Sequence, residues 1–168
     1  MVVERLGRLV TFDEITPGTC VAFSFGDTTY AGLKLEWQAG GQTSSFIGSL
    51  YPGDPDLRNI PGLYESGVFT HVPLYELPNL RISMPVSLSD VHVNPNNFPR
   101  APGQIYLTEK HELAIVLRYA NRNIAWSVNS GTFISSAPPV AWFSKWQMVY
   151  SEGDQREVIF TFEPRTSS

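Results

Sequence analysis

The residues with the clearest potential for metal chemistry lie in a turn-rich stretch between positions 51 and 64. Asp54, Asp56 and Asn59 place alternating oxygen-bearing side chains there. Calcium binds six to eight hard oxygen ligands, so a loop of this composition could hold a calcium ion. The twelve-residue pattern of a helix–loop–helix calcium site, with its terminal glutamate, is missing. An ordinary turn explains the same residues, and both interpretations stay open.

Aromatic side chains give the strongest indication of a ligand. In the expected strand 140–150, one face carries Trp142, Trp146 and Tyr150. Trp126, on a neighbouring expected hairpin, could extend that face. If the face points outward, it forms a flat platform of the kind on which sugar rings stack, and a contiguous exposed patch of this kind calls for a partner. If it points inward, the same rings fill the core.

Two long loops, 51–64 and 94–103, are expected to form or border the binding edge. They are rich in Asp, Asn, Pro and Gly, and loops at one end of a rigid scaffold commonly carry ligand contacts. Arg58 and Arg100 could orient an acidic or hydroxylated ligand, because a guanidinium offers a fork of donors. The alternative is that both loops are simply long connections stiffened by proline.

The carboxylates form no diagnostic catalytic pair. A glycosidase needs two carboxyl groups about 5–9 Å apart across a cleft. Several carboxylates lie at strand or strand-end positions where this is conceivable: Glu36, Glu76, Asp90 and Glu109. No pair is favoured over another, and no nucleophile motif or phosphate loop is present. We therefore expect a non-catalytic module that binds a carbohydrate or another surface ligand, with a small glycan-active hydrolase or lyase as the alternative.

Cysteine usage and the N-terminus leave the cellular compartment open. Cys20 is the only cysteine and lies in an apolar run, so it is expected to be a small buried hydrophobe and can form no intrachain disulfide. The segment 1–9 lacks the apolar stretch of a secretory signal peptide. Secretion or cell-surface display is expected if such a peptide has been removed.

One segment carries a family resemblance. Thr11-Phe12-Asp13, followed by Tyr30-Ala31-Gly32-Leu33 and Trp37, resembles the opening of a group of secreted β-sandwich proteins. The match covers residues 10–37. It implies an extracellular, jelly-roll-like module that is often suspected of binding carbohydrate.

The elements that must position these residues are strands. Apolar and polar residues alternate with a period of two, and no convincing long helix is found. The clearest expected strands cover 21–25, 29–37, 113–119, 124–128, 140–150 and 158–162. About ten such strands, separated by turns, predict a single all-β domain over 1–168, a two-sheet antiparallel sandwich with jelly-roll or related Greek-key connections.

Charge and composition exclude several partners. The 168 residues carry a net charge of −4, which argues against binding to nucleic acid, and no apolar run is long enough to span a membrane. With three lysines, the chain has few charges to protect its edge strands, so a structural, self-assembling sandwich is a further alternative. Prolines at 73, 78 and 85 supply part of that protection. Monomer and homo-oligomer both remain open.

Overall fold

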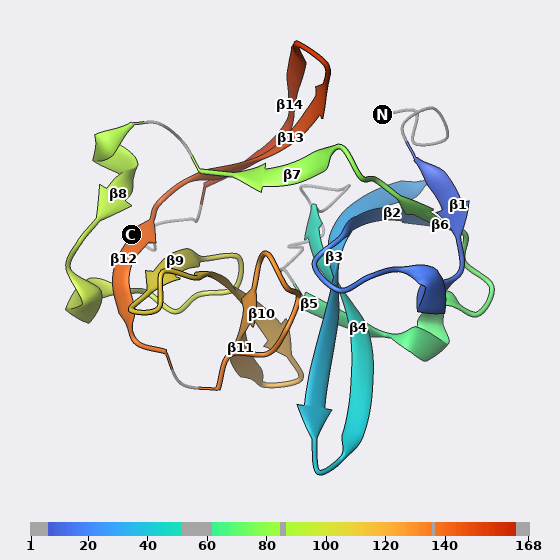
Figure 1. The fold of residues 1–168 in the computed structure, drawn as a ribbon, viewed down its shortest axis with the longest axis horizontal. Helices are drawn as coiled ribbons and strands as arrows, with labels where there is room; N and C mark the ends of the chain where they lie inside the picture. The colour runs from blue at the N-terminus through green and yellow to red at the C-terminus, as the bar shows by residue number, and fades with distance from the viewer. Residues whose placement is uncertain (1–6, 52–61, 85–86, 136, 164–168) are drawn as a thin grey trace.

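The computed structural model describes residues 7–51, 62–84, 87–135 and 137–163, which form strands joined by turns and short 3-10 helices (Figure 1). The first half contains β1 (Arg8–Val10), β2 (Cys20–Phe25), β3 (Thr28–Ala39), β4 (Gln42–Tyr51), β5 (Gly62–Glu65), β6 (Leu74–Glu76) and β7 (Leu80–Ser83). The second half contains β8 (Val91–His92), β9 (Ile105–Thr108), β10 (Leu113–Tyr119), β11 (Arg122–Ser127), β12 (Pro139–Phe143), β13 (Trp146–Glu152) and β14 (Gln155–Phe162). The 3-10 helices are η1 (Phe12–Glu14), η3 (Ser66–Phe69), η4 (Leu88–Asp90) and η5 (Pro95–Asn97).

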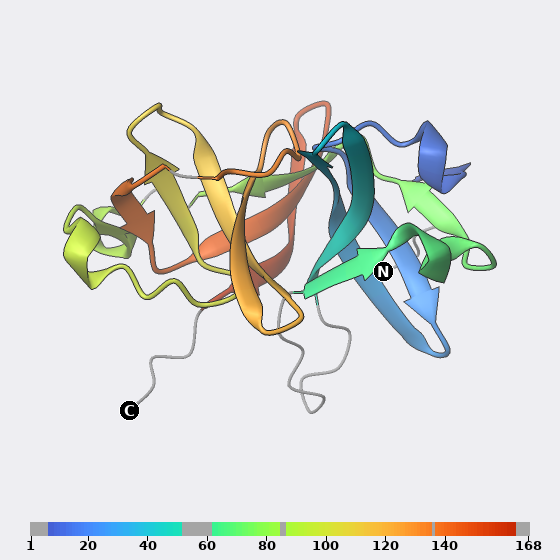
Figure 2. The same ribbon diagram turned by 90° about the horizontal axis from the view of Figure 1, so that it is seen from below.

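These strands form two sheets. The large sheet has the order β1-β6-β2-β3-β4-β5-β10-β9-β12-β8, with β11 beside β10, and the small sheet has the order β14-β13-β7. In Figures 1 and 2, β1–β6 lie at one end of the molecule and β8–β12 at the other, and green β7 lies between them with the red β13–β14 hairpin. The predicted all-β, mainly antiparallel fold is confirmed, whereas the jelly-roll connections stay a prediction. Among the described residues, no helix has the length and apolar character needed to span a membrane.

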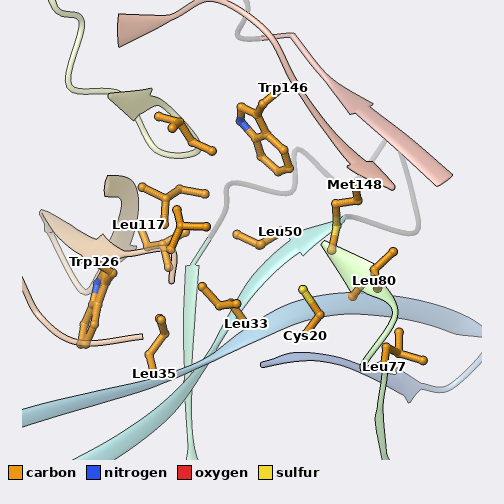
Figure 3. Packing of buried hydrophobic residues seen from close by; sticks show 14 of the residues in the cluster. Cys20, Leu33, Leu35, Leu50, Leu77, Leu80, Leu117, Trp126, Trp146 and Met148 are labelled. Carbon is orange, nitrogen blue, oxygen red and sulfur yellow. The ribbon is translucent and has the colours of Figure 1, made fainter. Parts of the chain in front are cut away.

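The principal hydrophobic core lies where the small sheet covers the large one. Trp146 and Met148 of β13 point toward Leu50 and Leu117 of the large sheet (Figure 3). Period-two alternation explains the pattern, because every second residue of β3 and β10 faces this core. Further apolar clusters cover the opposite face of the large sheet, so its central strands are buried on both sides.

The predicted long strand over 140–150 is wrong in one respect. The chain bends at Ser144 and Lys145, which separates β12 in the large sheet from β13 in the small sheet. At the bend, the Ser144 backbone N–H donates to the Asp90 carbonyl oxygen at 2.9 Å. Trp142 and Trp146 therefore belong to different sheets and do not share one strand face.

Two segments that are far apart in sequence meet on the backbone of β3. Gly18 donates its N–H to the Lys34 carbonyl at 2.8 Å, and Glu36 donates its N–H to the Gly131 carbonyl at 2.8 Å. Gly131 has φ of 67° and Gly18 has φ of 86°, which is the region that favours glycine. A Cβ atom on Gly131 would collide with the backbone of Gly18 and Lys34. We call this contact the glycine junction.

Lys34 fixes η1 against the other side of β3. Its side chain is only 2% exposed, and its Nζ donates to the Phe12 carbonyl at 3.0 Å and lies 3.3 Å from the centre of the Phe12 ring. Burial lowers the pKa of Lys34 to about 8, although the negative charges of Glu36 and Asp13 act to raise it.

Replacing Gly131 tests the glycine junction. Gly131→Ala should lower the free energy of unfolding by about 2–5 kcal/mol, because the new Cβ adds a collision to the strain of a positive φ. Gly40→Ala is the matched control: Gly40 has φ of 59° with nothing within 4 Å of an added Cβ, so about 1–2 kcal/mol should be lost. Urea unfolding measures both, and equal losses would contradict the junction.

The pKa of Lys34 predicts a pH dependence of stability. The pKa of this amine is about 8 in the folded protein and 10.5 ordinarily. Between these two pH values, the unfolded chain binds a proton at Lys34 that the folded chain does not. Stability must therefore rise with pH across this window relative to Lys34→Met, which lacks the titrating group. Urea midpoints of both proteins at pH 7.5, 9 and 10 give the measurement. Parallel pH profiles would show that Lys34 titrates normally.

Candidate functional site

A hollow of about 800 Å³ lies on the outer face of β9, β10 and β11. Its walls are completed by residues 133–135 and 137–139, by the loop that precedes β9 and by the end of β3. This volume falls within the range of about 300–1,000 Å³ that is usual for sites that take small molecules. The hollow is therefore the leading candidate for a ligand site.

Strand alternation builds the floor of the hollow. Ile105 and Ile115 face the principal core, so their neighbours Tyr106 and Val116 face the opposite side and line the hollow. Phe98 packs against Tyr106 with ring centroids 4.8 Å apart. The floor is thus apolar and is rigidly attached to the centre of the large sheet.

Trp37 and Phe133 form an aromatic wall. Their ring centroids lie 5.0 Å apart with planes inclined by 34°, and both side chains are half-buried. The Phe133 N–H donates to the Glu36 carbonyl at 3.3 Å, two residues after the glycine junction. Backbone pairing with β3 therefore sets the distance between the two rings.

Polar groups occupy the rim. Arg100, Arg122, Asn123 and Ser135 all line the hollow. The Asn123 side-chain amide donates to the Arg100 carbonyl at 3.0 Å, which ties the loop before β9 to β11. Arg100 has φ of 43°, a conformation that costs a non-glycine residue about 1–2 kcal/mol. The tie to Asn123 helps to hold Arg100 in this conformation.

The rim is electropositive. The described residues that line the hollow include two arginines and no carboxylate, and neither guanidinium forms an ion pair with any other residue that the structure describes. Burial raises the pKa of Tyr106, the positive charge of Arg100 opposes that rise, and the negative charge of Glu112 adds to it. The charge of Arg100 therefore acts on the floor of the hollow as well as on its rim.

The aromatic platform expected on residues 140–150 does not form. Trp146 and Trp126 are each 0% exposed and belong to the principal core. The Trp146 indole N–H donates to the Gly103 carbonyl at 2.7 Å, and its ring stacks on Phe162 with centroids 5.0 Å apart. These two tryptophans are structural, which corrects the hypothesis that they contact a ligand.

Trp142 and Tyr150 also lie outside the hollow. Trp142 is half-buried and stacks on the His92 ring of the neighbouring strand with centroids 3.9 Å apart. Tyr150 is half-buried on β13 and donates its hydroxyl to Glu152 at 3.2 Å. The four residues of the expected platform are therefore spread over three strands and do not share one surface.

The remaining predicted site residues have different outcomes. Arg58, Asp54, Asp56 and Asn59, and with them the calcium hypothesis, lie outside the described residues. Within the described ranges no cluster of three His, Cys, Asp or Glu residues is placed to hold a metal. Cys20 is buried, as predicted, and burial raises the pKa of its thiol to about 12.

The candidate carboxylates are not brought together at the hollow. Glu76 of β6 forms an ion pair with Arg8 of the neighbouring strand β1 at 2.7 Å, and Asp90 accepts from the Ser144 hydroxyl at 3.3 Å. Glu36 supplies its backbone to the glycine junction. None of these carboxylates lines the hollow.

Of the predicted ligand residues, Arg100 alone lines the hollow among those that the structure describes. Sequence reasoning missed Trp37, Phe133, Arg122 and Asn123. A weak signal existed for Trp37 only, because the sequence places this indole at the polar end of the alternating strand 29–37. Phe133 and Arg122 gave no signal, because long-range strand pairing brings them to the site.

Comparisons with protein-family models, with curated proteins and with solved structures gave no match to this chain. The resemblance of residues 10–37 to secreted β-sandwich proteins therefore stays a prediction, and the function must be inferred from the hollow itself.

Proposed function

We propose that this protein is a binding module that takes a carbohydrate in the hollow between Trp37, Phe133 and β9–β11. The observation that carries the proposal is the aromatic wall beside a rim of hydrogen-bond donors. A sugar ring presents an apolar face of C–H groups and an edge of hydroxyl groups. Aromatic rings can pack against the first, and guanidinium and amide groups can donate to the second.

The rigidity of the site supports this proposal. Trp37 lies on β3, Tyr106 on β9 and Asn123 on β11, so three strands of the large sheet carry the contacts. Rigid elements hold a site in its binding geometry and reduce the conformational entropy that binding costs. The loop residue Arg100 is tied to this scaffold through Asn123.

Binding is favoured over hydrolysis by the chemistry of the lining. Cleavage of a glycosidic bond uses a pair of carboxyl groups, one as acid and one as base or nucleophile. The described lining residues supply stacking surfaces and donors, and no Asp or Glu is among them. A glycan-active enzyme would instead place Glu36, Glu76, Asp90 or Glu109 beside the ligand.

Removing the aromatic wall tests the proposal. A glycan array of neutral and acidic oligosaccharides identifies bound probes, and calorimetry on the strongest gives a Kd. Trp37→Ala should raise that Kd at least about tenfold, since a buried aromatic contact contributes about 1.5–3 kcal/mol. Because Trp37 is half-buried and also packs against the principal core, circular dichroism must show that Trp37→Ala is folded before its Kd is compared.

Tyr150→Ala is the control for the rejected platform, because Tyr150 lies on β13 and does not line the hollow, and its Kd should stay within about twofold of the wild type. A Kd that rises in Tyr150→Ala and not in Trp37→Ala would move the site away from the hollow. Failure of the wild-type protein to bind any glycan on the array would overturn the proposal.

A further inference from the structure

We infer that the hollow selects a sugar that carries a carboxylate, such as a uronic or sialic acid, and that Arg100 and Arg122 together recognise that group. This inference rests on the proposed function, since it specifies the chemical class of the same ligand. It depends on the sign of the charge at the rim, on the geometry of the arginines and on the position of the aromatic wall.

The first argument is charge. The protein has 16 acidic and 12 basic side chains, yet the described lining of the hollow holds two guanidiniums and no carboxylate. Both guanidiniums border the same hollow, so an anion bound there is attracted by each of them. A neutral sugar leaves both guanidiniums without a counter-ion, whereas a carboxylate supplies one.

The second argument is geometry. A guanidinium is planar and presents parallel N–H donors that match the two oxygens of a carboxylate, which a lysine amine cannot do. Arg100 and Arg122 reach the rim from different elements, the loop before β9 and the start of β11. The Asn123 side chain, which binds the Arg100 carbonyl at 3.0 Å, connects these two elements.

The third argument is the arrangement of charge relative to the apolar surfaces. The electrostatic effect of Arg100 reaches the Tyr106 hydroxyl on the floor. Trp37 and Phe133 form the wall of the same hollow. A ring packed on the wall can therefore direct a carboxylate substituent to the rim, where the arginines lie. One acidic sugar can therefore contact the floor, the aromatic wall and the rim together.

Matched probe pairs test this inference. Trigalacturonate is compared with its fully methyl-esterified form, and sialyllactose with lactose, by calorimetry at low salt. At least one acidic member should bind about tenfold or more tightly than its neutral partner, and its affinity should fall as salt is added. Arg100→Gln and Arg122→Gln should each weaken that acidic probe about tenfold and leave the neutral partner nearly unchanged.

Arg118→Gln is the matched control, because Arg118 is an exposed arginine on β10 that does not line the hollow. Its affinity for the acidic probe should equal that of the wild type. Equal binding of acidic and neutral partners, with both lost in Trp37→Ala, would overturn the inference and keep the proposed function. An equal loss in Arg118→Gln would also overturn the inference. If no probe of either class binds, the proposed function itself fails.

Discussion

The candidate site depends on the backbone contacts of β3 between Lys34 and Glu36. There, the loop that contains Gly18 and the loop that contains Gly131 both pair with the strand, and only glycine fits at the point where they meet. Trp37, the residue after Glu36, contacts Phe133, which lies two residues after Gly131. A constraint on backbone packing thus determines the spacing of the aromatic rings that we propose bind a sugar.

One face of the large sheet carries the principal core and the other carries the floor of the hollow, while Trp37 and Phe133 of the wall also pack against the principal core. On one face, Leu33, Leu35 and Leu117 pack beneath Trp146 and Met148 of the small sheet (Figure 3). On the other face, Tyr106 and Val116 form the floor of the hollow.

Local patterns predicted the strands well but not their partners. The β2–β3 and β10–β11 hairpins cover the strands that alternation predicts at 21–25 and 29–37 and at 113–119 and 124–128. The bend between β12 and β13 escaped prediction, because it depends on a hydrogen bond to Asp90, more than fifty residues earlier. The prediction of a tryptophan platform was wrong because alternation assigns residues to the two faces of a strand but does not show which face another sheet covers. The wall of Trp37 and Phe133 arises from a pairing between positions almost a hundred residues apart.

The four tryptophan indole N–H groups allow the most direct test of where a ligand binds. In ¹H–¹⁵N spectra recorded during titration with trigalacturonate and with sialyllactose, the Trp37 indole should shift with at least one of them, since it borders the hollow. The indole N–H signals of Trp126 and Trp146, both 0% exposed in the core, should not shift. Shifts confined to Trp142, or none at Trp37 while a probe binds, would contradict a ligand site between β3 and β9–β11.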